Sequence, residues 1–379
     1  FFQLSTTLAL FHANPFLPSL ALVLGAGNIS SITPLDVVYK LFVEGSVCVV
    51  KMNPVNDYLG AHFEEIFADL VAEGFVRFAY GGANVGAYLT GHELADSIHI
   101  TGSARTYEAI VFGPGEEGRS NRAKGVRIND KPVGAELGGV GPVIVVPGAW
   151  SKADLRHQAE SIVSMKMHNS GFNCVAAQVV VMPAGWDLGP ALLDEIRSVL
   201  DEIDIRAPYY PGAVDRIEAM ADGARDVEVY GSEHSVYLLP DVDPGSDGAP
   251  FSTEVFGPAL AVVHLPAPDI PTYLINATRF ANERLAGTLG VNLVIDRRTQ
   301  KRHGRAVEQA LTDLEYGTIA VNTWTGAAYF LSACAWGAFP GHTPEDIGSG
   351  VGVVHNTLMF DKPEKSIVWG PFASAPRSF

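Results

Sequence analysis

Short apolar runs alternate with amphipathic stretches along this 379-residue chain, and no other feature of the sequence constrains its fold as much. Runs rich in valine and isoleucine are typical of strands buried on both faces, while the stretches between them have the periodicity of helices. This alternation predicts an α/β protein with a largely parallel sheet. The expected strands cover residues 20–24, 46–51, 76–80, 98–100, 143–146, 179–182, 290–295 and 366–369.

The helices expected between these strands cover residues 57–74, 152–167, 188–202 and 276–285, and another begins near residue 103. In the first of them Phe63, Phe67 and Leu70 recur at helical spacing, and Gly74 ends the pattern. Residues 113–130 are polar and glycine-rich, which predicts an exposed excursion. From Trp336 onward we expect irregular structure as far as the last strand.

The chain is acidic, with 26 lysines and arginines against 42 aspartates and glutamates, a formal net charge of -16. Phosphate backbones and anionic membrane surfaces repel such a chain, so the composition argues against nucleic acid as a partner. The first Asp, Glu, Lys or Arg is Asp36. His12, Asn14, Pro15 and Pro18 interrupt the apolar region before it, and no basic segment precedes them, so we expect buried strands there rather than a signal peptide or membrane span.

Cys48, Cys174 and Cys334 lie far apart, and no pair of them has the spacing of metal ligands. An odd count in a chain of this length is no disulfide framework, so we expect a reducing cytoplasm and no metal site. Cys174 ends the segment N-S-G-F-N-C, where backbone amides can favour a thiolate and hold an oxyanion. A lone cysteine is by itself more often buried packing, and we keep that interpretation for Cys48 and Cys334.

Glu136 begins the tetrapeptide E-L-G-G after a strand-like run. A carboxylate among small and apolar residues is costly to bury without a partner or a function. From the residues alone, Glu136 is either a strand-end carboxylate that accepts bonds from nearby amides or a general base that activates water.

Two further positions suggest ligand binding at strand ends. Thr101, Gly102 and Ser103 follow one expected strand and open a helix, an arrangement in which free amides can receive a phosphate. An ordinary helix N-cap at Ser103 explains the same residues. Lys51 ends another expected strand, where a lysine can reach ligand hydroxyls or phosphates, although plain solvation is the alternative.

Taken in order along the chain, these pieces resemble the aldehyde dehydrogenase superfamily. That family has an Asn after a strand, a strand-end Lys, a T-G-S turn, E-L-G-G, an N-x-G-x-x-C segment and an E-x-F-G-P segment. The corresponding positions here are Asn28, Lys51, residues 101–103, 136–139, 169–174 and 254–258. The resemblance extends from about Val23 to the C-terminus, and residues 317–322 resemble a late G-T-x-x-V-N strand of the family.

The resemblance implies an aldehyde dehydrogenase-like α/β fold with a doubly wound, Rossmann-type cofactor domain, an α/β catalytic domain and a small oligomerisation strand element. We expect an edge-strand segment for oligomerisation at residues 1–20 and an NAD(P)-binding domain at 21–138. The catalytic domain would follow at 139–338, and 339–379 would return to the cofactor domain and supply the oligomerisation strand. The last strand, 366–369, would then pair with a neighbouring subunit in a homodimer or homotetramer.

The resemblance also implies the residue roles. Cys174 would attack an aldehyde, Asn28 and the Cys174 amide would hold the oxyanion, and Glu136 would activate water to release the carboxylic acid. The cofactor, NAD or NADP, would meet Lys51, Gly102, Ser103, Leu137, Glu254 and Phe256.

Several positions depart from the family pattern: Gly27, Pro54, Tyr107, Phe172 and residues 324–350. Pro54 stands where the family often has the acid that holds the adenosine 2′-hydroxyl, so the choice between NAD and NADP stays open. The chain therefore looks like a divergent branch, and the sequence does not name the aldehyde.

Three alternatives stay open. An acyl-transferring relative would release the thioester to coenzyme A or phosphate, although Glu136 argues against it. A binding or scaffold protein with a degenerate site would fit the few residues before Asn28 and the divergent late segment, although Cys174, Glu136 and Asn28 are all present. A thiol hydrolase would use His168 with Cys174, six residues away.

Overall fold

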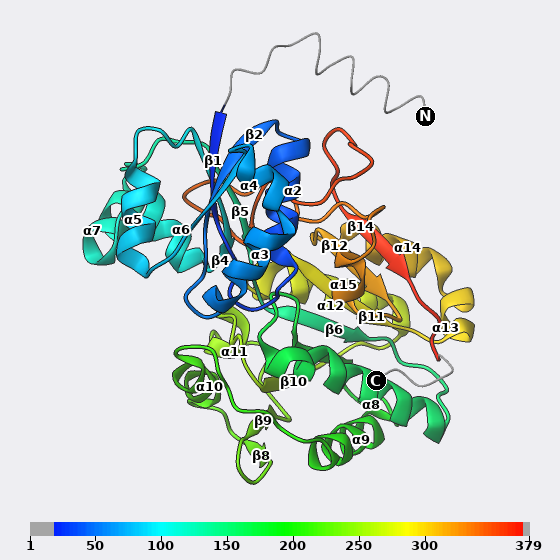
Figure 1. Cartoon of the computed structure of the whole chain (residues 1–379). Helices are drawn as coiled ribbons and strands as arrows, with labels where there is room; N and C mark the ends of the chain where they lie inside the picture. Colours follow the sequence, from blue (N-terminus) through cyan, green and yellow to red (C-terminus); the bar gives the residue numbers. More distant parts are fainter. Residues whose placement is uncertain (1–18, 374–379) are drawn as a thin grey trace. The chain divides into compact units, whose positions relative to one another are not determined.

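The computed structural model describes residues 19–373, and these divide between Ala135 and Glu136 into two compact units. Both units are built on β-sheets with helices, which confirms the α/β class (Figure 1). The edge-strand segment expected at 1–20 lies almost wholly outside the described residues. Residues 339–373, expected to return to the cofactor domain, group with the second unit, although Gly350–Val351 within them pairs beside the end of β5 (Val133–Leu137) in the smaller sheet.

The first unit contains a sheet in the strand order β5-β4-β1-β2-β3. Strand β1 pairs in parallel with β2 and β4, and β2 pairs in parallel with β3. Leu24 at the end of β1 is in register with Lys51 and Ile100, so the carboxyl ends of three strands meet at one edge. The strands are β1 (Ser19–Leu24), β2 (Ser46–Lys51), β3 (Val76–Ala79), β4 (Ser97–Gly102) and β5 (Val133–Leu137), the last of which crosses the boundary between the units.

The helices of the first unit correct one expectation and add detail to another. The helix expected at 57–74 is broken into η1, α3 and α4, because Phe67 leaves helical geometry with φ -99° and ψ 21° while its ring stays buried. The stretch 113–130 contains a helix, α7, with an acidic first turn and a basic last turn. The helices are α2 (Ile32–Phe42), η1 (Asp57–Leu59), α3 (Gly60–Ile66), α4 (Ala68–Ala72), α5 (Ala83–Gly91), α6 (Ala104–Val111) and α7 (Gly115–Ala123).

The second unit contains a larger sheet in the order β14-β12-β11-β6-β7-β10-β9-β8. Its pairings are parallel from β14 to β9, and β8 pairs antiparallel with β9. The strands are β6 (Gly141–Val145), β7 (Ala177–Pro183), β8 (Glu228–Tyr230), β9 (Val236–Leu239), β10 (Ala259–Leu265), β11 (Gly290–Val294), β12 (Thr318–Val321) and β14 (Ser366–Trp369).

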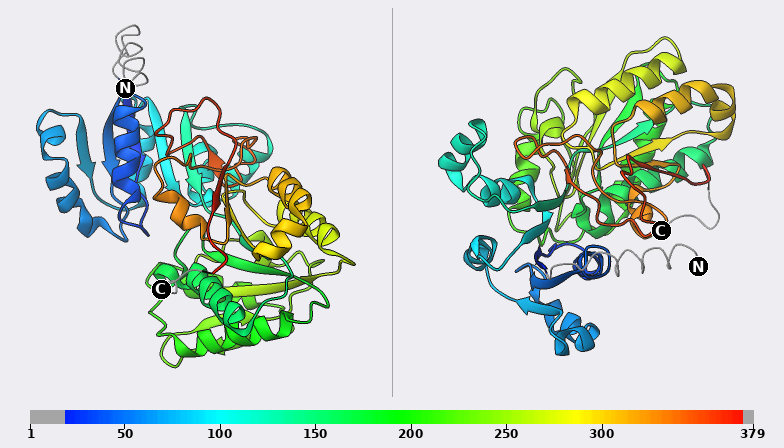
Figure 2. Two further views of the ribbon diagram at one scale, coloured as in Figure 1. Left: turned by 90° about the vertical axis from the view of Figure 1, so that its right-hand side faces the viewer. Right: turned by 90° about the horizontal axis from the view of Figure 1, so that it is seen from above.

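Helices cover both faces of this larger sheet, which explains why its strands are continuous apolar runs (Figure 2). Val143 and Val145 of β6 pack with residues of α8 and α9, while Ile144 packs with residues of α12 and α14 on the other face. The helices are α8 (Lys152–Met167), α9 (Gly189–Glu202), α10 (Ala213–Ala221), α11 (Ala249–Ser252), α12 (Ile270–Arg284), α13 (Arg297–Arg302), α14 (Gly304–Asp313) and α15 (Thr325–Tyr329).

Helix α12 begins six residues before the expected start at 276. The Asp269 side chain caps it by accepting a bond from the Thr272 amide at 2.8 Å, and Pro271 stands in its first turn. An Asp N-cap followed by a Pro in the first turn is a sequence signal for a helix start, and the expectation, which used apolar spacing alone, did not include this signal.

The end of the chain is largely irregular, as expected, with a short strand β13 (Gly350–Val351) and an isolated bridge between Trp336 and His355. Strand β14 forms at the expected residues, but it pairs with β12 of the same chain, with Ser366 opposite Thr318. Strand β12 thus satisfies one edge of β14, and β14 is the last strand of its sheet, so its pairing with a neighbouring subunit through the other edge stays a prediction.

Candidate active site

The segment that carries Cys174 turns sharply after helix α8. The short helix η2 (His168–Gly171) follows at once, and Asn169, Ser170 and Gly171 all have positive φ, at 53°, 55° and 79°. At Gly171 a side chain is excluded, since an added Cβ would lie 2.5 Å from the Gly257 carbonyl oxygen. The turn therefore packs backbone to backbone against the segment 254–258 and presents Cys174 just before β7.

The Cys174 thiol faces the carboxylate of Glu136, with its Sγ 3.6 Å from Oε1. Glu136 is 2% exposed, near the end of β5. Burial raises the pKa of the Cys174 thiol well above its ordinary value, and the carboxylates of Glu136 and Glu254 raise it further, while the Cys174 backbone amide acts in the opposite direction. The thiol is thus protonated in this arrangement, and Glu136 is placed to accept its proton.

A second carboxylate and a buried amine lie in the same region. Burial raises the pKa of Glu254 to about 8, against the opposing effects of Lys166 and Arg216. Burial lowers the pKa of Lys166 to about 7, and this side chain is 1% exposed. The Glu254 carboxylate lies against Gly138, where an added Cβ would overlap it. The glycines after Glu136 thus let two carboxylate-bearing segments approach each other.

Three polar side chains hold the backbone of the segment 253–257. Gln178 donates to the Thr253 oxygen at 2.8 Å and accepts from the Val255 amide at 2.8 Å. Arg216 donates to the oxygens of Val255 and Phe256, at 2.9 and 3.1 Å, and Lys166 donates to that of Gly257 at 2.9 Å. These contacts fix Glu254 and give Phe256 its positive φ of 40°.

Sequence analysis missed Gln178, Arg216 and Lys166, as well as Trp336, whose indole Nε1 donates to Glu136 Oε1 at 3.2 Å. Lys166 left a signal, because it is a charged residue on the buried face of α8 beside Ile162 and Val163. The sequence gives no such signal for Trp336, because this residue lies in irregular structure.

His168, the base of the thiol-hydrolase alternative, is engaged elsewhere. Its Nδ1 lies 2.9 Å from Asn173 Nδ2, and its ring packs on Trp324 with centroids 5.0 Å apart. Burial, followed by the nearby Arg206, lowers its pKa. The side chain that faces the Cys174 sulfur is Glu136, so the geometry does not favour a Cys–His hydrolase.

The other two cysteines have packing environments. Cys48 is buried in β2, its Sγ 3.8 Å from the Ser46 oxygen, and burial raises its pKa to about 12. Cys334 is half-buried, and burial raises its pKa as well. All three cysteines are free.

The strand ends of the first unit border a cavity of about 1020 Å³. Lys51, Asn53, Thr101 and Gly102 line it, together with residues of α5 and α6. Lys51 is buried, and burial lowers its pKa against the opposing effect of Asp57. A cavity at the carboxyl ends of parallel strands, lined by a glycine turn and by two lysines, Lys51 and Lys131, fits a nucleotide cofactor.

The structure also shows where Ser103, Asn28 and Tyr107 of the first unit lie. Ser103 is the N-cap of α6 and accepts from the Thr106 amide at 3.3 Å, so the N-cap interpretation is confirmed. Asn28 lies in the loop between β1 and α2, which Asn56 anchors through a 3.0 Å bond to the Ala26 oxygen. Tyr107, in place of a family glycine, is 2% exposed and so part of the core.

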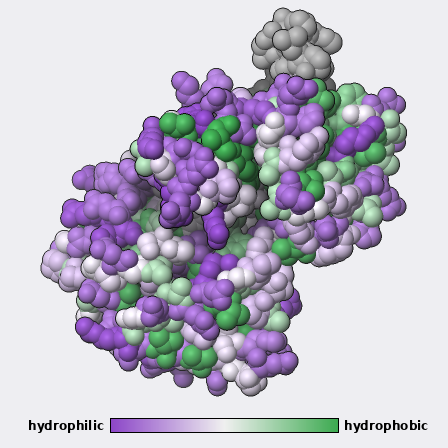
Figure 3. Space-filling view, turned by 90° about the vertical axis from the view of Figure 1, so that its left-hand side faces the viewer, coloured by the Kyte–Doolittle hydropathy of each residue, from purple (hydrophilic) through white to green (hydrophobic). Residues whose placement is uncertain are grey.

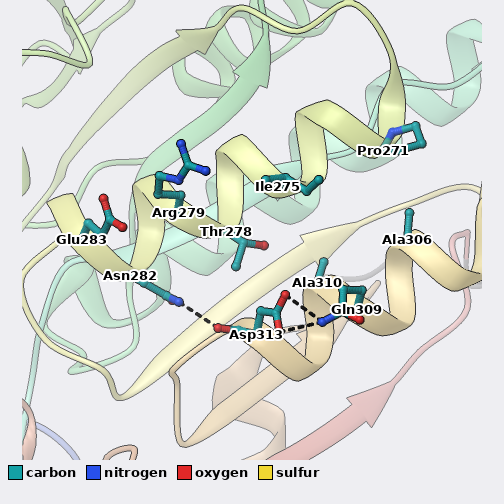
Figure 4. A pocket seen from close by; sticks show the side chains of 10 residues that line it. All are labelled: Pro271, Ile275, Thr278, Arg279, Asn282, Glu283, Ala306, Gln309, Ala310 and Asp313. Carbon is teal, nitrogen blue, oxygen red and sulfur yellow. Dashed lines mark hydrogen bonds between the residues drawn. The ribbon is translucent and has the colours of Figure 1, made fainter.

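A smaller cavity of about 310 Å³ lies between α12 and α14 (Figure 4). Asn282 crosses toward α14 and donates to the Asp313 oxygen at 2.8 Å, while Gln309 binds the Asp313 carboxylate. None of the predicted catalytic residues lines this cavity.

Hydrophilic side chains predominate on the face shown in Figure 3, in keeping with the charge of -16. Among residues 19–373, no helix is long and apolar enough to cross a membrane. Within the same range no cluster of His, Cys, Asp and Glu has the composition of a metal site.

Comparison with known proteins agrees with this arrangement of motifs. The sequence profile of the aldehyde dehydrogenase family matches residues 8–209, and the chain belongs to this family. It is 26% identical over 266 residues to an N-succinylglutamate 5-semialdehyde dehydrogenase of Sphingopyxis alaskensis, a match that covers 64% of this chain and 51% of the relative. It is 24% identical over 242 residues to a coniferyl aldehyde dehydrogenase of a Pseudomonas species, covering 59% and 47%. The chain thus spans about half the length of these curated relatives.

Solved structures show the same fold. An NAD-dependent aldehyde dehydrogenase from Sinorhizobium meliloti superposes with a TM-score of 0.66 at 17% identity, covering 88% of this chain and 63% of that one. An NADP-dependent glyceraldehyde-3-phosphate dehydrogenase from Bacillus halodurans, solved with NADP, gives 0.64 at 22% identity, covering 88% and 65%. The expected aldehyde dehydrogenase-like fold is confirmed.

Proposed function

We propose that the protein oxidises an aldehyde to a carboxylic acid, with NAD or NADP as the hydride acceptor. The observation that carries this proposal is the contact between the Cys174 thiol and the Glu136 carboxylate, 3.6 Å apart. The two residues come from separate motifs by which the chain resembles its family. A nucleophile paired with a base at this distance is the arrangement that covalent catalysis needs.

The first step is attack on the aldehyde. Glu136 accepts the thiol proton as the Cys174 sulfur bonds to the carbonyl carbon, and the carbonyl oxygen becomes an oxyanion. The raised pKa of the thiol makes a neighbouring base necessary. The Asn28 side chain and the Cys174 amide are the proposed oxyanion donors.

NAD or NADP, when bound, supplies the hydride acceptor for this adduct. The cavity of the first unit would hold the nucleotide, with Lys51 at the ribose hydroxyls and the amides near Gly102 and Ser103 at the phosphates. In the second unit Leu137, Glu254 and Phe256 are the proposed contacts of the cofactor.

The last step is hydrolysis of the thioester left on Cys174. Before this step Glu136 releases the thiol proton to solvent and is a carboxylate again. Glu136 then accepts a proton from water, the water oxygen bonds to the acyl carbon, and the carbon–sulfur bond breaks. The Cys174 thiolate takes that proton from Glu136, and the carboxylic acid leaves. Because the base is present and buried beside the sulfur, hydrolysis is favoured over acyl transfer to coenzyme A or phosphate.

The test is NAD(P)H absorbance with a panel of aldehydes. The names of the relatives suggest two starting points, a carboxylated aliphatic semialdehyde and an aromatic aldehyde. Adding coenzyme A or phosphate to parallel reactions reveals an acyl-transferring enzyme, because turnover would then depend on the acceptor. Nucleotide binding without turnover of any aldehyde would instead support the scaffold alternative.

We also propose that the chain forms a homodimer or homotetramer in the cytoplasm. Strand β14 is the edge of its sheet, and Ile367 and Trp369 on it are exposed. An apolar, open strand edge favours pairing with another chain. Light scattering on the full chain and on a chain ending at Lys365 tests this, and we expect the shorter chain to be a monomer. A full-length monomer at micromolar concentration contradicts the proposal.

A further inference from the structure

The irregular segment after α15 returns to the base of the proposed reaction. Trp336 is 1% exposed, and its indole Nε1 donates to Glu136 Oε1 at 3.2 Å, across 200 residues of sequence. This is the same oxygen that faces the Cys174 sulfur. One carboxylate oxygen thus lies between a thiol and a fixed neutral donor.

The indole has little freedom to leave this position. The Trp336 amide donates to the His355 oxygen at 2.8 Å, and the Val354 amide donates to the Trp336 oxygen at 3.0 Å. The Tyr329 ring meets the indole edge-on, with centroids 5.2 Å apart. Apolar side chains that include Val175 and Leu289 pack around it. Backbone and side chain are both held, so the N–H direction is preset.

The same late segment holds the residues that follow Glu136. The Leu137 amide donates to the Ser349 oxygen at 2.8 Å, and the Ser349 hydroxyl donates to the Gly138 oxygen at 3.0 Å. Glu136, Leu137 and Gly138 are therefore each bonded to the segment between Trp336 and Ser349. The part of the sequence that departs most from the family pattern thus supports the catalytic turn.

We propose that Trp336 is a positioning residue for hydrolysis of the thioester: its N–H fixes the rotamer of Glu136 and stabilises the carboxylate charge that accepts the proton of water. This inference rests on the proposed function. A neutral donor beside a carboxylate favours the ionised form. The charge of Glu136 acts on Cys174 and on Glu254, and the charges of Lys166 and Arg216 act on Glu254. Loss of the N–H leaves these groups in place.

The test measures how fast an acyl group on Cys174 is hydrolysed when no cofactor is present. p-Nitrophenyl acetate transfers its acetyl group to the Cys174 sulfur and releases p-nitrophenolate, and intact mass reports how long the acetyl-enzyme lasts. In Trp336→Phe we expect acetylation to persist and deacetylation to slow roughly tenfold. We also expect the acid limb of the deacetylation pH profile to move upward by about one to two units.

Trp324→Phe is the matched control, because the Trp324 indole donates to the backbone oxygen of Val175 at 3.0 Å rather than to Glu136. It should leave the acid limb where the wild type has it. If Trp336→Phe does not fold, benzothienylalanine at position 336 replaces only the N–H, by sulfur. The inference is overturned if either Trp336 variant folds, acetylates and keeps the wild-type acid limb.

The outcome is separable from that of the proposed function. A shifted acid limb in a protein that oxidises no aldehyde keeps the role of Trp336 and removes the dehydrogenase. Aldehyde oxidation with an unshifted limb keeps the dehydrogenase and reduces Trp336 to a packing residue.

Discussion

The strand ends of the first unit and the turn around Cys174 in the second unit use polar side chains in opposite ways. In the first unit Lys51, Thr101 and Gly102 border an open cavity of about 1020 Å³. In the second unit the half-buried Cys174 faces the buried carboxylate of Glu136. A sheet edge lined by glycines and two lysines suits binding, whereas a thiol in contact with a buried carboxylate suits proton and acyl transfer.

Cys48 in the first unit and Cys174 in the second unit show the same difference between binding and reaction. Cys48 and Cys174 both have raised pKa values, and burial is the main cause in each case. They differ in their neighbours, since Cys48 contacts the Ser46 carbonyl oxygen while Cys174 faces a carboxylate that can take its proton. Burial alone makes a thiol inert, and a base beside it makes reaction feasible.

The largest effect is expected from Cys174→Ala. Aldehyde oxidation should fall by roughly a thousandfold or more, because no other group at the site can form the covalent adduct. Nucleotide binding, measured by calorimetry, should persist, because the cavity belongs to the first unit. Cys48→Ala is the matched control and should retain turnover. Wild-type turnover in Cys174→Ala would show that the nucleophile lies elsewhere.

Glu136→Gln should produce the next largest effect. The amide keeps the shape of the side chain but cannot accept a proton, so hydrolysis should slow by roughly a hundred- to ten-thousandfold. Rapid mixing should show a burst of NAD(P)H that forms more slowly than in the wild type, because the base for the thiol proton is lost, and then a stall, with the acyl group on Cys174 detected by mass. Glu136→Asp keeps a carboxylate and should recover part of the steady rate. A burst at the wild-type rate would show that another group takes the thiol proton and would confine Glu136 to hydrolysis.

A smaller effect is expected from Lys166, and it is measured as a change in the free energy of unfolding with pH. Its pKa falls from 10.5 in the unfolded chain to about 7 in the fold, so between these values the unfolded chain holds a proton that the folded one lacks. The free energy of unfolding should therefore rise with pH across this window. Glu254, whose pKa is raised to about 8, has the opposite effect at lower pH, so the rise is clearest above about pH 8.

Lys166→Met should flatten this rise in denaturant titrations at a series of pH values. Lys152→Met, at the exposed start of the same helix, is the control and should keep it. An unchanged slope in Lys166→Met would mean that Lys166 stays charged in the folded protein.

Much of the fold was predictable because its strands are buried on both faces. The runs expected at 46–51 and 366–369 form strands at those residues. An expectation failed at Phe67, which breaks a helix, and the exposed stretch 113–130 contains a helix, α7, that its polar composition did not predict. The motifs located Cys174 and Glu136, which the fold brings together. The partners of Lys166 and Trp336 lie 91 and 200 residues away in the sequence. A charge on the buried face of α8 is the one local signal for Lys166, and no local pattern predicts the contact of Trp336.

The smallest effect concerns cofactor choice in the first unit. Pro54 offers no acceptor for an adenosine 2′-hydroxyl, so we expect weak discrimination between NAD and NADP in kcat/KM. The exposed Asp57 acts electrostatically on Lys51, so its charge would oppose a 2′-phosphate bound near Lys51. Asp57→Asn should shift the ratio toward NADP by roughly two- to fivefold, the size of one screened surface charge. Asp69→Asn removes the same charge from an exposed site on α4 and should leave the ratio unchanged. Equal shifts in both variants would reflect net charge, and a wild-type preference for NAD above roughly a thousandfold would require an acid other than Asp57 at the ribose.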